Sequence, residues 1–135
     1  PGISGHELLT VLTMVWISDA AAYFVGKRMG RRRVLVHISP KKTVEGFLAG
    51  LFVPPLLMGW LWPWPIGGGG PVGFMLVVLA VAAAGILGDL LESLWKRGAG
   101  VKDSSNLLPG HGGLLDRMDS LLLAVPAYCL CRAVC

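Results

Sequence analysis

The 135-residue sequence has few charged residues: only 15% are Asp, Glu, Lys or Arg, whereas 54% are hydrophobic. With a mean hydropathy of +0.66, the chain is too apolar for an ordinary soluble domain of this size. The scarcity of charge therefore argues against a soluble enzyme and indicates an integral membrane protein.

Cysteine is also scarce, and the three cysteines are Cys129, Cys131 and Cys135. Their spacing matches neither a zinc site nor a disulfide framework, so we interpret them as small apolar residues that face lipid or protein, with palmitoylation near the membrane surface as the alternative. The start, PGISGHE, lacks both a basic leader and a cleavage pattern, and we expect no signal or transit peptide there. Because the first residue is Pro1, we expect the sequence to be a piece of a longer or processed protein.

Long apolar runs are present, and they predict four membrane spans, at 8–25, 44–62, 72–91 and 121–135. A helix needs about 20 apolar residues to cross the hydrocarbon, and each span must be helical because lipid offers no partner to backbone polar groups. We therefore predict an all-α integral membrane protein with about four transmembrane helices. The whole chain, residues 1–135, would form one membrane-embedded catalytic domain with two cytoplasmic polar loops.

Basic residues are concentrated in two of the connecting segments. Residues 26–43 hold seven of the twelve Lys and Arg residues, residues 92–119 hold four, and residues 63–71 hold none. By the positive-inside rule, both basic segments face the cytoplasm and the third faces the other side. The expected location is a bacterial inner membrane or an organelle membrane.

Small and polar residues mark the end of the first span. Ser18, Ala22 and Gly26 recur every four residues, which lets another helix backbone approach closely. Packing does not account for Asp19, because an acidic residue at this depth is costly without a partner or a role. Asp19 is therefore a functional candidate, and a salt bridge to the basic segment is the alternative.

The segment SPKKTVEG precedes the second span. Thr43 can cap the helix, Glu45 lies in its first turn, and Lys41 and Lys42 lie beside the positive end of its dipole. Lysines beside exposed helix-start N–H groups suit phosphate, although a solvated basic loop is the alternative. The upstream run RMGRRR is interpreted as a topology signal that attracts anionic lipid head groups.

Five of the eight acidic residues lie between residues 88 and 120. One face of the third helix carries side chains spaced three and four apart: Asp89, Glu92, Ser93 and Lys96. Asp116 and Asp119 offer a second carboxylate pair, and the turn PGHGG between the pairs can bring backbone amides to a phosphate. Carboxylates backed by lysine suit Mg²⁺ that holds phosphate oxygens, so the segment predicts metal-assisted phosphoryl or nucleotidyl transfer.

The run SLWKRGAGVKDSSNLLPGHGGLLDRMDS, residues 93–120, resembles the C-terminal signature of the phosphatidate cytidylyltransferases, also called CDP-diacylglycerol synthases. SDAAAYFVGK is similar to the serine-aspartate helix of that family, and HISPKKTVEG is similar to its SPKKTxEG loop. Trp95 departs from the family, which more often has an aliphatic residue or Phe there. Bacterial members have several more helices before this region, so the chain resembles only about the C-terminal half of an enzyme.

The resemblance implies that CTP and phosphatidate give CDP-diacylglycerol and pyrophosphate, with Mg²⁺ as cofactor. It implies Asp89 and Asp116 as metal ligands, with Asp119 in a supporting or second-metal role. The expected partners are CTP, phosphatidate and the lipid bilayer, with no nucleic acid and with a homodimer left open.

The resemblance also implies a set of residues around the substrates. Catalytic roles fall to the three aspartates with Lys96, Lys102 and His111, and His111 has a loop-stabilising hydrogen bond as its alternative role. Substrate-binding roles fall to Ser18, Asp19, Lys41, Lys42, Ser93, Arg97, Gly112, Gly113 and Arg117. Within this set, Lys96, Arg97, Lys102 and Arg117 would neutralise the triphosphate.

Two rival functions remain open at this point. One is a CTP-dependent lipid kinase of the dolichol or phytol type, which would release CDP instead of pyrophosphate. The other is an inactive membrane fragment that binds anionic lipid or partner helices.

Overall fold

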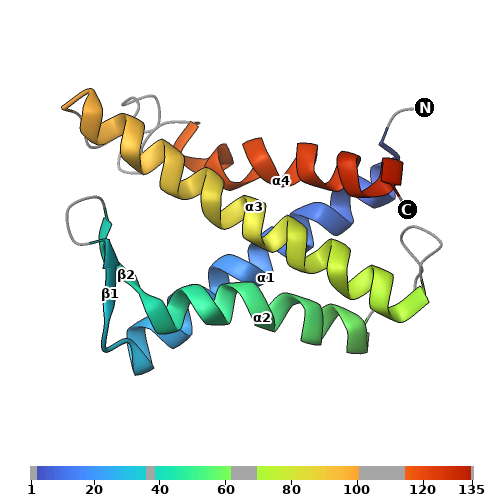
Figure 1. Cartoon of the computed structure of the whole chain (residues 1–135), viewed down its shortest axis with the longest axis horizontal. Coiled ribbons are helices and arrows are strands. Elements are labelled where there is room, and N and C mark those ends of the chain that lie inside the picture. The colour runs from blue at the N-terminus through green and yellow to red at the C-terminus, as the bar shows by residue number, and fades with distance from the viewer. Residues whose placement is uncertain (1–2, 36–38, 62–69, 101–114, 135) are drawn as a thin grey trace.

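The four apolar stretches of the sequence form helices, as the computed structural model shows (Figure 1). It describes residues 3–35, 39–61, 70–100 and 115–134. The helices are α1 (Gly5–Met29), α2 (Val44–Leu61), α3 (Gly70–Gly98) and α4 (Leu115–Val134). The prediction of an all-α protein with four helices is confirmed.

Two of the described helices, α1 and α3, are long and apolar enough to cross a membrane by length and composition, whereas α2 is shorter. Both long helices exceed the spans expected from hydropathy, because α1 continues to Met29 and α3 continues to Gly98. Large apolar side chains point outward along the helices, including Leu9, Trp16, Phe52 and Leu76, each at least half exposed. In water such a surface would promote aggregation, so it fits a protein surrounded by lipid or by further helices.

A small β-hairpin, which the sequence did not predict, joins α1 to α2. Strand β1 (Arg33–Leu35) pairs antiparallel with β2 (Ser39–Thr43), with Arg33 opposite Thr43. The end of β2 leads directly into α2, where the Thr43 hydroxyl accepts a hydrogen bond from the Gly46 amide at 3.2 Å. The predicted helix cap at Thr43 is therefore confirmed.

Close packing between α1 and α2 depends on small residues on both helices. A Cβ atom added to Gly46 would lie 2.6 Å from the Ala22 carbonyl oxygen, and one added to Gly50 would lie 3.1 Å from that of Ser18. The buried Ser18 hydroxyl donates to the Gly50 carbonyl at 2.8 Å. The stripe of small residues on α1 therefore has the helix partner that its spacing predicts.

The apolar core lies where α1, α3 and α4 meet, and α2 adds Met58 to it. It contains Val11, Met14 and Val15 of α1, Phe74, Val77, Val78 and Val81 of α3, and Ala124 and Tyr128 of α4. The four helices run along one another, with α1 packed mainly on α2 and α3 mainly on α4.

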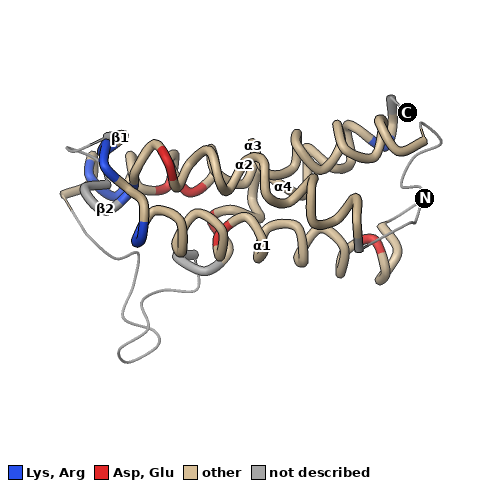
Figure 2. Tube along the Cα trace, turned by 90° about the horizontal axis from the view of Figure 1, so that it is seen from below, with Lys and Arg blue, Asp and Glu red and all other residues tan. Residues whose placement is uncertain are grey.

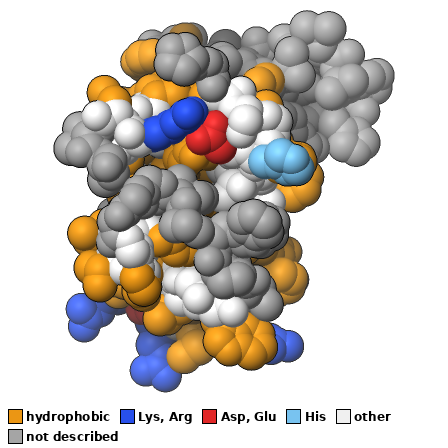
Figure 3. Space-filling view, turned by 90° about the vertical axis from the view of Figure 1, so that its right-hand side faces the viewer, with side chains coloured by type: hydrophobic (Ala, Val, Ile, Leu, Met, Phe, Trp, Pro, Cys, Tyr) orange, Lys and Arg blue, Asp and Glu red, His pale blue; other side chains and the backbone are white. Residues whose placement is uncertain are grey.

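The end of the molecule that carries both termini has a single described cluster of paired charges. Figure 3 views this end and shows a few charged side chains among hydrophobic and uncharged atoms. The Glu7 carboxylate accepts from the Ser4 amide at 2.8 Å, from the Tyr128 hydroxyl at 3.2 Å and from Arg132 Nη1 at 2.9 Å. These bonds tie the first turn of α1 to the last turns of α4.

Candidate active site

Charged residues gather at the opposite end of the helices, around the β-hairpin (Figure 2). This end contains the last turn of α1, the hairpin, the first turn of α2, the last turns of α3 and the first turn of α4. The two segments that the sequence predicts to form one site, 18–46 and 88–120, therefore meet in the fold through their described residues.

The two segments make direct contact through Lys42 and Asp89. Lys42 lies in β2 and Asp89 in α3, and the Lys42 ammonium donates to Asp89 Oδ2 in an ion pair. Both side chains are about one-third exposed, so a ligand can still reach them. The pair places a cation and a carboxylate together at the end of the helix bundle.

Two more aspartates approach this pair from other helices. The charges of Asp89 and Asp119 both act on Asp19 of α1, so one aspartate from each of α1, α3 and α4 contributes to a single negative region. Gly88 of α3 allows α4 to approach closely, because a Cβ atom added at Gly88 would lie 2.5 Å from the Asp119 carbonyl oxygen.

Asp119 precedes the predicted fourth span, and its environment raises the pKa of its carboxyl group. Burial is the main cause, because it disfavours the charged form, and the Asp89 charge adds to it. The Ser120 amide opposes this shift by donating a hydrogen bond to Asp119 Oδ1 at 2.6 Å. A nearby cation would favour the charged carboxylate.

Lys96 and Glu92 form an ion pair along α3, with Lys96 Nζ 3.2 Å from Glu92 Oε1. Glu92 is only 3% exposed, which makes it the most deeply buried described acidic residue. The prediction that Asp89, Glu92, Ser93 and Lys96 lie on a helix is confirmed by the extent of α3.

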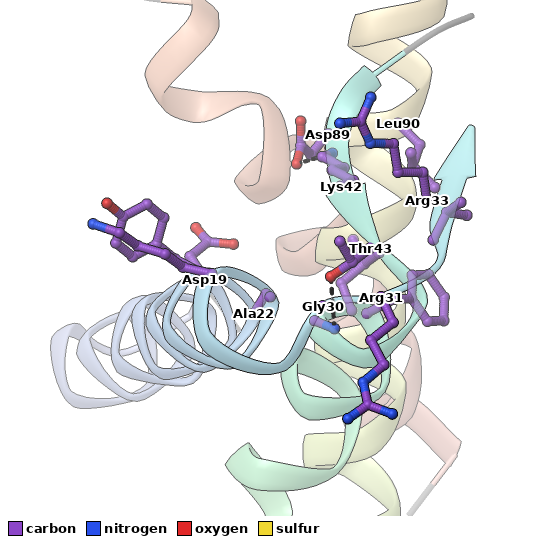
Figure 4. Close-up of a pocket in the computed structure, with 16 residues that line it drawn as sticks. Asp19, Ala22, Gly30, Arg31, Arg33, Lys42, Thr43, Asp89 and Leu90 are labelled. Atoms are coloured by element: carbon purple, nitrogen blue, oxygen red, sulfur yellow. Dashed lines mark hydrogen bonds and ion pairs between the residues drawn. The ribbon is translucent and has the colours of Figure 1, made fainter. Parts of the chain in front are cut away.

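A cavity of about 780 Å³ lies beside the Lys42–Asp89 pair (Figure 4). Its walls come from α1, the hairpin, α2 and α3. Asp19, Lys42 and Asp89 all line it, so the structure brings these three predicted site residues together around one space. Its size suits a small molecule or the head-group region of a lipid.

The other predicted site residues fall into two groups. Ser18 lies outside this cavity and bonds to α2, while Ser93, Lys96 and Arg97 lie further along α3. For seven predicted residues, the structure describes either no atoms or only the backbone. Lys102, His111, Gly112 and Gly113 lie outside the described residues, and only the backbones of Lys41, Asp116 and Arg117 are described, in β2 and α4.

Sequence reasoning did not assign Arg31 and Arg33 to the site, although both line the cavity. It interpreted their basic run only as a topology and lipid-attraction signal. The turn between α1 and β1 explains the difference, because it brings Arg31, and Arg33 at the start of β1, to the cavity. The role of these arginines could have been anticipated only if the turn and the hairpin had been recognised.

Mg²⁺ is the metal expected at this end of the bundle. Within the part of the chain that the structure describes, no three His, Cys, Asp or Glu residues are grouped closely enough to hold a metal ion by themselves. Mg²⁺ does not require such a group, because it usually takes one or two protein carboxylates and fills its shell with water and phosphate oxygens. The neighbouring carboxylates of Asp89 and Asp119 fit this kind of site.

Comparison with known proteins identifies the family to which the chain belongs. A model of the cytidylyltransferase family matches residues 4–135. The chain is 43% identical over 126 residues to a phosphatidate cytidylyltransferase of Haemophilus influenzae and 44% identical over 125 residues to one of Staphylococcus aureus. It is also 44% identical over 119 residues to one of Bacillus subtilis.

These alignments cover 90%, 90% and 84% of this chain, but only 43%, 46% and 42% of the respective relatives. The chain therefore spans less than half the length of the curated relatives that it matches. The similarity reaches both charged segments and all four helices, because the family match runs from residue 4 to residue 135.

Proposed function

The chain belongs to the cytidylyltransferase family, and on that premise we propose that this protein transfers a cytidylyl group from CTP to phosphatidate. The products would be CDP-diacylglycerol and pyrophosphate, and the role would be phospholipid biosynthesis. The names of the similar bacterial proteins support this choice of substrates. A lipid substrate would also account for a site at the end of an apolar helix bundle.

The observation that carries the proposal is the contact between Lys42 and Asp89 beside a cavity that Asp19 also lines. These residues are far apart in sequence: Asp19 and Lys42 lie in stretches that resemble the family, and Asp89 lies four residues before the third such stretch. In the proposed reaction, a phosphate oxygen of phosphatidate attacks the α-phosphorus of CTP, and the bond to the pyrophosphate leaving group breaks. A positive charge such as that of Lys42 stabilises the negative charge that develops on these oxygens.

Mg²⁺ is part of the proposal, with Asp89, Asp116 and Asp119 as its protein ligands. When bound, the ion would neutralise negative charge on the phosphate oxygens. The chain's own basic residues would complete this role, with Lys96 and Arg97 in the last turns of α3 joined by Lys102 and Arg117. Lys41 would act beside Lys42, and His111 with Gly112 and Gly113 would contact phosphate oxygens.

The site would face the cytoplasm, where CTP is made, because the hairpin end of the bundle carries most of the basic residues. Phosphatidate would reach the cavity from the surrounding leaflet. The bilayer is therefore both the solvent of the helices and the source of one substrate.

Labelled CTP separates this function from its rivals. The full-length protein is incubated with phosphatidate, Mg²⁺ and CTP that carries the label either on the α- or on the γ-phosphorus. A cytidylyltransferase moves the α label into lipid and releases the γ label as pyrophosphate. A CTP-dependent lipid kinase, given a lipid alcohol, moves the γ label into lipid and releases CDP, and an inactive fragment moves neither label.

A further inference from the structure

Among the residues whose side chains the structure describes, more basic than acidic ones line the cavity. The basic residues are Lys27, Arg31, Arg33 and Lys42, and the acidic residues are Asp19 and Asp89. Lys42 is already paired with Asp89. Lys27 lies with its ammonium 5.6 Å from the centre of the Tyr23 ring, in a cation–π contact. Of these described basic residues, the two arginines therefore provide most of the positive charge that remains for a ligand.

The backbone around the arginines is fixed by Glu45. Its Oε2 atom accepts hydrogen bonds from the amides of Arg31 and Arg32, at 3.1 and 3.3 Å. Arg31 and Arg33 then line the cavity, whereas Arg32 between them does not. The first turn of α2 thereby sets which basic side chains of the segment reach the cavity.

Arg33 is the better placed of the two. In Figure 4 its side chain extends toward the end of the cavity where Lys42 and Asp89 meet, whereas the Arg31 side chain extends away from that end. Among the residues that the structure describes, the Arg33 guanidinium forms no ion pair. Its charge is therefore available to an anion beside Lys42.

The other walls of the cavity are apolar. Phe47 of α2 and Ile86 and Leu90 of α3 line it next to the basic hairpin. A phosphate attached to a hydrocarbon matches this combination, since the arginine can bind the phosphate and the apolar wall can contact the glycerol and the first carbons of the chains. CTP has no hydrocarbon chains, and its triphosphate is attached to a polar ribose.

We propose that Arg33 binds the phosphate monoester of the lipid substrate and determines specificity for it. The inference rests on the proposed function, since it assigns a residue to the phosphatidate side of that reaction. A guanidinium can hold two phosphate oxygens at once, and a lysine ammonium acts only as a point charge. Phosphodiester lipids, which present fewer charged oxygens, would bind Arg33 more weakly.

The kinetic test uses the full-length protein with Arg33→Gln and Arg33→Lys, and with Arg32→Gln as the matched control. We expect Arg33→Gln to raise the KM for phosphatidate by about tenfold or more, the usual effect of losing a charged hydrogen bond, with the KM for CTP little changed. Arg33→Lys should fall between wild type and Arg33→Gln. Arg32→Gln should resemble wild type.

A binding measurement keeps the inference separate from the reaction. Retention of labelled phosphatidate by the purified protein, without CTP, is compared with retention of phosphatidylcholine for the same variants. Loss of phosphatidate retention in Arg33→Gln alone supports the inference, even if wild type makes no CDP-diacylglycerol and the proposed function fails.

Two results would overturn the inference. One is phosphatidate retention that is equal in Arg33→Gln and Arg32→Gln. The other is a rise in the KM for CTP instead of that for phosphatidate, which would assign Arg33 to the nucleotide.

Discussion

Lys42 and Asp89 show how an apolar chain can carry charge at the proposed site. An isolated ion is costly at the end of a membrane helix, but here each group has a partner of opposite charge. Both remain partly exposed, so the pair can open toward a metal ion or a phosphate. Asp19 and Asp119 lie near enough to feel the Asp89 charge, and they add negative charge that a divalent cation would offset.

Replacement of Lys42 tests whether the pair serves the reaction. We expect Lys42→Gln to lower kcat/KM for CDP-diacylglycerol formation on the order of 10²-fold, the effect typical of removing one group that stabilises developing charge. Arg28→Gln is the control, since Arg28 is an exposed residue of the last turn of α1 that does not line the cavity. Equal activity of the two variants would contradict a role for Lys42 in the reaction.

At the residue scale, the sequence predicted which residue types meet but not all of their contacts. Asp19, Lys42 and Asp89 were predicted site residues, and the fold brings them to one cavity. Ser18 was grouped with them, but its hydroxyl bonds to the Gly50 carbonyl, because the stripe on which it lies faces α2. One helical turn contains both packing and cavity-lining positions, and the sequence alone does not separate them.

At the scale of elements, glycines set the distance between helices that carry the site. Gly88 is one residue before Asp89, and it lies directly against the Asp119 backbone. Two of the expected metal ligands are therefore held near each other by contact between α3 and α4, and any side chain at residue 88 would push the two helices apart.

Gly88→Ala should lower stability by about 1–3 kcal/mol, the usual cost of inserting an atom into a packed contact, and should reduce activity by separating Asp89 from Asp119. Gly73→Ala is the matched control on the same helix, because no atom lies within 4 Å of the added Cβ. Thermal unfolding in detergent, together with CDP-diacylglycerol formation, measures both effects. A Gly88→Ala protein as stable and active as Gly73→Ala would refute this role of the contact.

The helices were predictable because runs of about 20 apolar residues have one stable structure in lipid. The β-hairpin was not, since β1 has only three residues, Arg33–Leu35, and no alternating apolar pattern marks it. Tertiary contacts define β1: it pairs with β2, and the Glu45 carboxylate accepts hydrogen bonds from the amides of Arg31 and Arg32 just before it. For that reason the cavity-lining role of Arg33 could not be predicted from the basic run.

At the scale of the whole molecule, charge divides the bundle into two different ends. The hairpin end carries the cavity and most of the basic residues, and the other end carries Glu7, Tyr128 and Arg132 in one small cluster. An apolar surface joins them, as expected for helices that cross a bilayer. The curated relatives are more than twice as long as the aligned part of this chain.

The proposed orientation predicts which end is accessible from which side of the membrane. In a protein whose native cysteines are replaced, Arg28→Cys should react with a membrane-impermeant thiol reagent only from the cytoplasmic side, and Ile3→Cys only from the other side. The positive-inside rule is the physical reason. Labelling of Arg28→Cys in intact cells would indicate the opposite orientation, with the site on the side of the membrane away from CTP.

The most direct test of the central claim is CDP-diacylglycerol formation by the full-length protein with CTP, phosphatidate and Mg²⁺, in wild type and Asp89→Asn. Asparagine keeps the size of the side chain but loses the charge that would hold Mg²⁺ and pair with Lys42. We predict Mg²⁺-dependent product in wild type and a loss of at least about two orders of magnitude in Asp89→Asn, recovered in similar amount as folded protein. Equal product from both proteins would contradict the assignment of Asp89 to the metal and of this end of the bundle to the reaction.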